Sequence, residues 1–433
     1  MKRETADLLI TNANELVTLR GGSRRPLVGK QMDALGIIKD GAIAVRNGRI
    51  LTVGKTSEIE KQFRAEKTID ATGRLVVPGF VDPHTHLVFA GSREGEFEMR
   101  LKGVSYMEIL RKSGGILKTV RSTRQATEQE LVESGMKTLD IMLAHGTTTV
   151  EAKSGYGLNL EDELKCLKVA KKLGEKHPVD VVPTFLGAHA VPEEYKGNTD
   201  GYVETITDKM IPKVARQGLT EFCDVFCEKD VFSVEQSRRI LLKGREYGLK
   251  PKVHADEMTP FGGAELAAEV DAVSAEHLLF ASDNGLRMMA KTGVIAVLLP
   301  AAAFSLMTWK YADARKMISL GVPVSLGTDF NPSCWVENQQ LVITLACRQM
   351  QMSPAEALVA VTINAAHAVK RAHEVGSLEA GKKADIAILD VPDHRFLGYR
   401  FGVNLVEKII KEGKVVVDVE SRVSRVKRKG EVN

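Results

Sequence analysis

The stretch that decides the fold of this 433-residue chain is Val77-Pro78-Gly79-Phe80-Val81-Asp82-Pro83-His84-Thr85-His86-Leu87, an apolar run that ends in two histidines. Residues two apart on a β-strand point to the same side. His84 and His86 are therefore predicted to present their imidazoles at one spot, at the carboxyl end of the strand. Two converging imidazoles begin a site for zinc or iron if further His, Asp or Glu ligands join them.

The middle of the chain alternates β-branched or apolar runs with helical patterns. Such alternation is typical of a (β/α)8 TIM barrel. We expect its strands near residues 77–84, 147–153, 180–187, 222–227, 251–255, 272–278, 293–299 and 322–328. In this fold catalytic groups lie at the carboxyl ends of the strands, so the polar residues that end each run are the candidates.

Both ends of the chain have the character of short strands and turns. Residues 6–71 include Asn47-Gly48, a strong hairpin signal, and residues 384–390 and 406–417 show a similar pattern. We expect the two ends to pair into a small β-sandwich domain. The expected domains are residues 1–74 and 373–433 for the two parts of the sandwich, and residues 75–372 for the barrel.

The composition favours a small-molecule enzyme. With 60 basic and 56 acidic residues the formal charge is +4, which indicates neither nucleic acid nor a membrane surface as partner. The five cysteines form no regular framework, and the N-terminus lacks the apolar stretch of a secretory signal, so we expect a cytoplasmic protein. The most apolar segment, residues 294–304, contains Pro300 and is too short to cross a bilayer, so we expect a buried strand there.

Polar residues end several of the expected barrel strands. His254 ends the fifth, His277 the sixth and Asp329 the eighth, in addition to the two histidines of the first. A buried polar group without a partner costs about 1 to 3 kcal/mol, so a purely structural origin for all five needs many separate partners. A shared metal ion satisfies most of them together.

We therefore predict that one metal ion is held by His84, His86, His254 and Asp329, with a water or hydroxide at an open position. Glu257, three residues after His254, and His277 remain for proton transfer. A metal can lower the pKa of water from 15.7 to roughly 7, which provides hydroxide at neutral pH.

These motifs resemble those of the amidohydrolase superfamily, in its barrel and in the terminal segment Gly376-Ser377-Leu378-Glu379-Ala380-Gly381. Within it the chain is similar to the imidazolonepropionases over nearly its whole length. The matching stretches are His84-Thr85-His86-Leu87-Val88-Phe89-Ala90-Gly91-Ser92-Arg93-Glu94, Glu151-Ala152-Lys153-Ser154-Gly155-Tyr156-Gly157-Leu158, Phe185-Leu186-Gly187-Ala188-His189, His254-Ala255-Asp256-Glu257 and Thr328-Asp329-Phe330-Asn331-Pro332.

The resemblance implies hydrolysis of the cyclic amide of 4-imidazolone-5-propanoate to N-formimidoyl-L-glutamate, in histidine degradation, with one Zn²⁺ or iron ion. Ring opening needs a polarised carbonyl, a proton for the departing ring nitrogen and a base for the attacking water. We expect Glu257 to transfer the proton to the ring nitrogen, His277 to polarise the carbonyl or orient the water, and Asp329 to accept the proton of the water. These three roles are exchangeable at this stage.

The resemblance also implies the substrate contacts. Arg93 is expected to bind the propanoate, and the other contacts are Tyr156, His189, Glu257, Asn331 and Ser333, with Tyr106 a further candidate for the propanoate. The chain has Pro332-Ser333-Cys334 where the family commonly has Gly and then Ser or Thr after the proline, which leaves the contact at Ser333 open. A homodimer is expected from the family.

Other interpretations of the same residues remain. The alternatives are another ring-acting amidohydrolase, such as a purine or pyrimidine aminohydrolase, and an inactive barrel that keeps its metal as an assembly partner. A nucleobase has no carboxylate for Arg93 to bind, and a scaffold has no need of Glu257 and His277. Lys153 is predicted to form a buried ion pair rather than to bridge two metals as a carboxylated lysine.

Overall fold

The computed structural model describes residues 3–104 and 114–419. The chain divides into two compact units. One consists of Asp82–Leu139 and Val150–Glu337, and the other of Met1–Val81, Asp140–Thr149 and Asn338–Asn433. No helix within the described ranges combines the length and the apolar character that crossing a bilayer requires.

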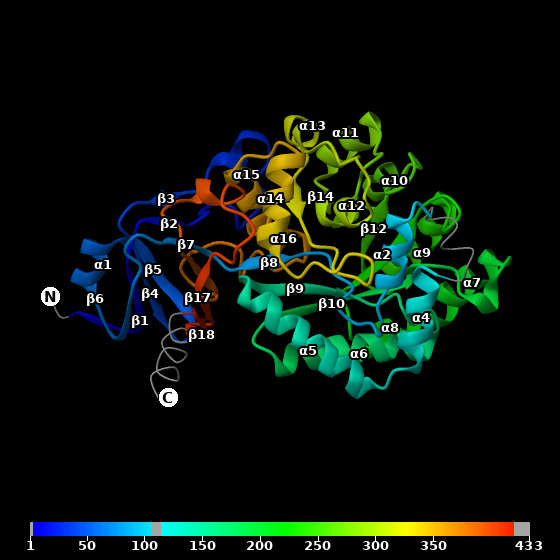
Figure 1. The fold of residues 1–433 in the computed structure, drawn as a ribbon, viewed down its shortest axis with the longest axis horizontal. Helices are drawn as coiled ribbons and strands as arrows, with labels where there is room; N and C mark the ends of the chain where they lie inside the picture. Colours follow the sequence, from blue (N-terminus) through cyan, green and yellow to red (C-terminus); the bar gives the residue numbers. More distant parts are fainter. Residues whose placement is uncertain (1–2, 105–113, 420–433) are drawn as a thin grey trace. The chain divides into compact units, whose positions relative to one another are not determined.

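Eight parallel strands form one sheet in which each strand lies beside the next along the chain. This confirms the predicted (β/α)8 architecture. The strands are β8 (Phe80–Asp82), β9 (Thr147–Lys153), β10 (Asp180–Ala188), β11 (Phe222–Cys227), β12 (Lys250–Ala255), β13 (Ser274–His277), β14 (Ile295–Leu298) and β15 (Val324–Leu326). Figure 1 labels β8, β9, β10, β12 and β14 of this sheet.

The barrel closes where the segment after β8 meets the segment after β15. Thr85 and Phe330 form a parallel bridge, and the His86 amide donates to the Phe330 carbonyl at 2.8 Å. A buried carboxylate reinforces the closure, because Asp82 accepts the Thr328 amide at 3.1 Å and the Thr328 hydroxyl at 2.6 Å. The closing contacts thus lie directly beside His84, His86 and Asp329.

Helices follow the strands, and their sequences explain where they begin and which face they bury. In α9 the Ser233 hydroxyl accepts the Gln236 amide in a capping box, and Ile240, Leu241 and Gly244 are buried at helical spacing. The helices are α2 (Glu94–Leu101), α4 (Ile116–Gln125), α5 (Glu128–Ala144), α6 (Leu160–Lys176), α7 (Thr199–Thr205), α8 (Ile211–Gln217), α9 (Val234–Glu246), α10 (Gly263–Glu269), α11 (Asp283–Thr292), α12 (Pro300–Ser305), α13 (Ala314–Ser319), α14 (Gln339–Gln349), α15 (Pro354–Ala360) and α16 (Ile363–Ala368).

The two ends of the chain share a sheet, as predicted. β16 (Ile386–Leu389) lies between β17 (Val406–Lys411) and β7 (Leu75–Pro78) in a six-stranded sheet that also contains β18 (Lys414–Asp418), β2 (Glu15–Val17) and β3 (Ile37–Ile38). A four-stranded sheet contains β1 (Glu4–Ala13), β4 (Gly41–Arg46), β5 (Arg49–Lys55) and β6 (Phe63–Asp70), which follows α1 (Thr56–Gln62). The hairpin of β4 and β5 turns at Asn47-Gly48, and both turn residues have positive φ.

Two predicted strands are corrected by the structure. The expected first strand, residues 77–84, is divided at Gly79: Val77 and Pro78 belong to β7 and pair with β16, whereas the barrel strand β8 begins at Phe80. A side chain at Gly79 would collide with Thr148, whose Oγ1 would lie 2.3 Å from the added Cβ. In the apolar segment 294–304 only Ile295–Leu298 is a strand, because Pro300 begins the helix α12.

We predict that Thr328→Val lowers the free energy of unfolding by about 1 to 3 kcal/mol, because it leaves one oxygen of the buried Asp82 carboxylate without its hydroxyl donor. Equilibrium unfolding in urea measures this loss. Thr149→Val is the matched control, since the buried Thr149 hydroxyl has no hydrogen-bond partner among the described residues. Equal stability of the two variants would contradict the role of the Asp82–Thr328 contact.

Candidate metal centre and active site

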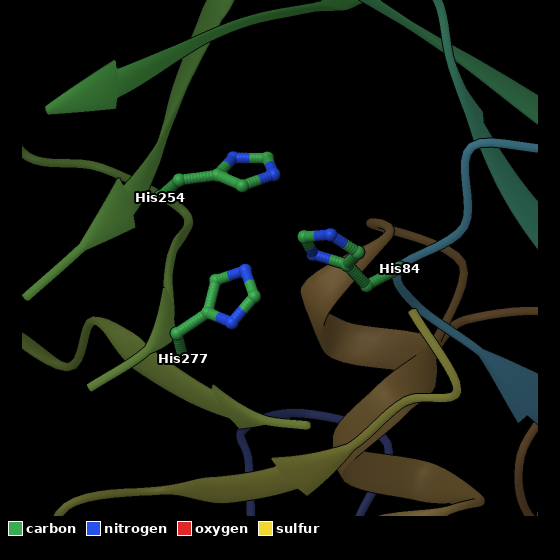
Figure 2. A group of neighbouring side chains, drawn as sticks. All are labelled: His84, His254 and His277. Atoms are coloured by element: carbon green, nitrogen blue, oxygen red, sulfur yellow. The ribbon is translucent and has the colours of Figure 1, made fainter. Parts of the chain in front are cut away.

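Histidines from three barrel strands meet at the carboxyl end of the sheet. Figure 2 shows the rings of His84, His254 and His277 facing a common point from separate segments of the chain. The ring centroid of His84 lies 4.7 Å from that of His254 and 5.6 Å from that of His277. His86 lies beside them, with its centroid 5.4 Å from that of His84.

A carboxylate from the eighth strand completes this group. Oδ1 of Asp329 lies 3.3 Å from Nε2 of His84 and 3.5 Å from Nε2 of His86. Burial favours a protonated carboxyl, but the imidazoles of His84, His277 and His254 together outweigh it and hold the pKa of Asp329 below its usual value. The predicted residues His84, His86, His254, His277 and Asp329 are therefore brought together, although 245 positions separate the first from the last.

The arrangement fits a metal ion. The Nε2 atoms of His84 and of His254 are buried and have no hydrogen-bond partner among the described residues. Two sets of ligand atoms, one from His84, His86 and Asp329 and one from His84, His254 and His277, each lie within 4.8 Å of one another. Buried nitrogens without donors or acceptors are costly, and coordination to a shared cation satisfies several at once.

A layer of buried charges lies beside the histidines. The Lys153 ammonium is 2.7 Å from Asp224, 2.9 Å from Glu151 and 3.0 Å from Glu276. The Lys252 ammonium is 2.6 Å from Glu151 and 3.2 Å from Glu276. All five side chains have zero exposure, which confirms the predicted buried ion pairing of Lys153. We call these five residues the buried charge layer.

The buried charge layer contacts the rings through their Nδ1 atoms. Nδ1 of His84 is 2.7 Å from Glu276, and Nδ1 of His254 is 3.1 Å from Asp224. A carboxylate beside one ring nitrogen fixes the ring and leaves the other nitrogen for a metal. Burial alone would lower the pKa of His84, but the carboxylates of Glu276 and Asp329 together outweigh burial and raise this pKa to about 9.

Glu257 and His277 form a second pair at the same end of the barrel. Oε2 of Glu257 lies 3.6 Å from Nε2 of His277. Burial, with the charges of Asp329 and Glu228, raises the pKa of Glu257 to about 8. Burial lowers the pKa of His277 to about 3. At neutral pH the carboxyl is therefore protonated and the imidazole neutral.

His277 and two other residues of this end of the barrel have sparsely populated backbone conformations. Asp256, His277 and Asp329 all have positive φ, of 50°, 70° and 51° respectively. Non-glycine residues adopt this region rarely, and it is found preferentially at functional sites. Hydrogen bonds hold the third of them, since the Asp329 amide donates to the His84 carbonyl at 3.0 Å.

A cavity of about 610 Å³ opens above the histidines and Asp329. Its walls contain every predicted substrate contact within the described residues, namely Arg93, Tyr156, His189, Glu257, Asn331 and Ser333. Tyr106 lies outside the described residues. The walls also contain Arg100, Lys310 and Phe226, which were not predicted from the sequence. For Arg100 a signal existed, because it lies seven residues after Arg93, two helical turns along.

Arg93 is a buried cation without a full set of partners. Its side chain is 5% exposed, and its Nε and Nη1 atoms have no hydrogen-bond partner among the described residues. The nearest carboxylate, that of Glu96, is 4.0 Å from Nε. A buried guanidinium in this state is suited to bind an anion in the cavity.

The other predicted contacts lie on three loops. His189 stacks on His86 with ring centroids 4.8 Å apart, and its Nδ1 lies 3.0 Å from the Gly155 carbonyl. The Tyr156 ring is 5.6 Å from the His86 ring. The Asn331 side chain donates to the Asp329 carbonyl and accepts the Ser333 amide, both at 2.8 Å, so it also orders the loop after β15.

Comparison with known proteins places the chain in a family. The model of the amidohydrolase family matches residues 75–419. The imidazolonepropionase of Geobacillus sp. (strain WCH70) is 57% identical over 415 residues, which cover 95% of this chain and 98% of that protein. The imidazolonepropionase of Alkaliphilus metalliredigens is 52% identical, with the same coverage of both proteins. The chain belongs to the imidazolonepropionases, within the amidohydrolase family.

Solved structures of lower identity share the fold. An adenosine deaminase from Xanthomonas campestris with bound zinc is 18% identical, with a TM-score of 0.71 over 99% of this chain and 98% of that one. Guanine deaminase of E. coli is 14% identical, with a TM-score of 0.72 over 95% and 98%. Membership in the amidohydrolase family makes the chain a hydrolase of a metal-dependent type, in agreement with its candidate ligand groups.

We predict that Lys153→Met lowers the free energy of unfolding by at least about 3 kcal/mol, because it leaves three buried carboxylates with Lys252 as the remaining cation of the layer. Urea unfolding of the purified variant measures the change. Lys172→Met is the matched control: Lys172 is half-exposed and pairs with Glu128 at the surface, so its loss is expected to cost under about 1 kcal/mol. Similar losses for both variants would contradict the importance of the layer.

Proposed function

We propose that the chain hydrolyses the cyclic amide of 4-imidazolone-5-propanoate to N-formimidoyl-L-glutamate, a step of histidine degradation. The observation that carries the proposal is the buried Arg93 guanidinium in the same cavity as the histidines and Asp329. The substrate joins a ring amide to a carboxylate tail, and the cavity offers groups for both. The high identity to imidazolonepropionases over 95% of the chain supports the same reaction.

His84, His86, His254 and Asp329 are the proposed ligands of one Zn²⁺ or iron ion. Imidazole and carboxylate suit both metals. When bound, such an ion acts as a Lewis acid that lowers the pKa of water, so that hydroxide is available at neutral pH. What supports this choice is that the buried Nε2 atoms of His84 and His254 have no hydrogen-bond partner among the described residues, together with the position of Asp329 beside two of the rings.

The protonation states divide the remaining chemistry. Asp329, with its lowered pKa, is charged at neutral pH and accepts a proton from the attacking water. His277 is neutral and donates an N–H hydrogen bond that polarises the ring carbonyl. Glu257 is protonated at neutral pH, and it gives its proton to the departing ring nitrogen. The pKa of Glu257 is raised and that of Asp329 is lowered, so the first is proposed as the acid and the second as the base.

The propanoate tail is proposed to lie against Arg93, with charge-assisted hydrogen bonds from its Nε and Nη1 atoms. Tyr156, His189, Asn331 and Ser333 line the remaining walls and are proposed to orient the ring. Three further expectations accompany the proposal: a homodimer, domain boundaries after residues 74 and 372, and a cytoplasmic location, which the five cysteines without disulfides support.

Loss of the ultraviolet absorbance of 4-imidazolone-5-propanoate tests the function on the metal-loaded protein. Turnover of guanine or cytosine without turnover of the imidazolone would overturn it.

We predict that Arg93→Met raises KM for the imidazolone about ten- to hundredfold with little change in kcat, because charge-assisted hydrogen bonds are worth about 1.5 to 3 kcal/mol. Arg121→Met, which alters a half-exposed ion pair with Glu193, is the control. An equal loss in kcat would remove Arg93 from tail binding.

We predict that Glu257→Gln lowers kcat by about 10² to 10⁴ while the metal content stays that of the unaltered protein, since the amide keeps the shape but cannot transfer the proton. His84→Ala is expected to lose the metal as well as activity. Elemental analysis and steady-state kinetics on both variants separate the two effects. An unchanged kcat for Glu257→Gln would show that this carboxyl takes no part in the reaction.

A further inference from the structure

Glu228, the residue directly after β11, is a buried carboxylate that the proposed chemistry does not use. Its side chain has zero exposure. Oε2 accepts the amides of Met258 at 2.9 Å and of Thr259 at 3.3 Å. Oε1 accepts the Thr259 hydroxyl and, at 2.9 Å, the Lys229 amide. No lysine, arginine or histidine of the described ranges pairs with it. Its hydrogen-bond donors are therefore the backbone amides and the Thr259 hydroxyl, which are all uncharged.

Asp256 fixes the other side of the same loop. Its Oδ1 accepts the amides of Phe261, Gly262 and Gly263 at 2.8, 2.9 and 3.1 Å, and its Oδ2 accepts the Ala264 amide at 2.8 Å, at the start of α10. Glu257 therefore lies between two anchored points of the backbone. Its own carboxyl is 19% exposed and faces the cavity.

We propose that Glu228 is a positioning residue for Glu257: it binds the backbone of residues 258 and 259 and so holds the Glu257 carboxyl at the departing ring nitrogen. The inference rests on the proposed function of Glu257. A carboxylate is needed for this task because both of its oxygens only accept hydrogen bonds. A glutamine at 228 would turn its NH₂ group either toward the backbone N–H of Lys229 or toward those of Met258 and Thr259, and would lose the hydrogen bonds on that side because a backbone N–H cannot accept.

The charge of Glu228 acts in the same direction. After burial and the charge of Asp329, it is the third cause that keeps the pKa of Glu257 high, against the opposite effect of His84. A proton donor must carry its proton when the substrate is bound. The geometric and the electrostatic contributions of Glu228 thus both serve the proton transfer that Glu257 is proposed to perform.

Glu163 offers a matched comparison, since it performs the same structural task on a different loop. It is fully buried, and its Oε1 accepts the amides of Gly155, Gly157 and Leu158 at 3.1, 2.8 and 2.9 Å. That loop carries Tyr156, a proposed substrate contact, and not Glu257. Loss of the Glu228 or the Glu163 carboxylate is expected to lower the free energy of unfolding. Only loss of the Glu228 carboxylate is expected to change kcat through Glu257.

A double-mutant cycle tests the inference on the metal-loaded full chain. Glu228→Gln is expected to lower kcat about tenfold with KM within about threefold of the original and with unchanged metal content. In the Glu257→Gln background the same substitution is expected to change kcat less than twofold, because the group it positions is already inactive. Glu163→Gln is expected mainly to raise KM, and by the same factor in both backgrounds.

Thr259→Val provides a second route if Glu228→Gln fails to fold, because it removes one donor and leaves the buried carboxylate in place. It is expected to lower kcat severalfold, and to have no effect in the Glu257→Gln background. Losses that multiply in the double variants, or an unchanged kcat in both single variants, would overturn the positioning role. If Glu257→Gln itself leaves kcat unchanged, the proposed role of Glu257 falls, and this inference falls with it.

Discussion

The interaction on which the site depends is the contact of the Lys153 ammonium with three buried carboxylates. Asp224, Glu151 and Glu276 all lie within 3.0 Å of this single cation, and none of the four side chains is exposed. Carboxylates in a low-dielectric interior repel one another strongly unless cations lie between them. Two of these carboxylates contact Nδ1 of His84 and of His254. The orientation of both rings therefore depends on these two carboxylates, which the ammonium of Lys153 holds in place.

The titratable side chains of the site have pKa values that are shifted in opposite directions, although they lie close together. His84, beside Glu276, has a raised pKa, whereas His189 and His277, buried among other imidazoles, have a pKa lowered to about 3. Glu257 is shifted upward and Asp329 downward, although both line one cavity. These differences arise from which charges each group faces. One cavity thus combines a carboxyl with a raised pKa, an imidazole with a lowered pKa and a carboxyl with a lowered pKa.

The fold alone does not choose the substrate. Deaminases of 14% and 18% identity share the architecture over nearly the whole chain. In such barrels the catalytic groups lie at the strand ends, and the loops vary with the substrate. Here the segment after β8 places the buried Arg93 in the cavity wall. A buried guanidinium whose Nε and Nη1 atoms have no hydrogen-bond partner among the described residues favours an anionic substituent on the ring.

The sequence determined the barrel and most of the candidate site. His84, His254, His277 and Asp329 each end an apolar run, and parallel strands bring their carboxyl ends to one edge of the sheet. For the same reason the position of a residue after its strand was enough to predict Glu257. Arg93, Tyr156, His189, Asn331 and Ser333 came from the family resemblance, and all lie in the walls of the cavity.

Only the tertiary structure decided the contacts that hold these groups. The partners of Lys153 come from β9, β11 and β13, and Glu228 binds amides thirty and thirty-one residues further along the chain. Likewise, the requirement for glycine at position 79, where the first predicted strand is divided, follows from the nearby Thr148 side chain. Local spacing predicts which face of a strand a side chain occupies, but the distance between atoms of different strands depends on register, barrel closure and packing. Those are properties of the folded chain.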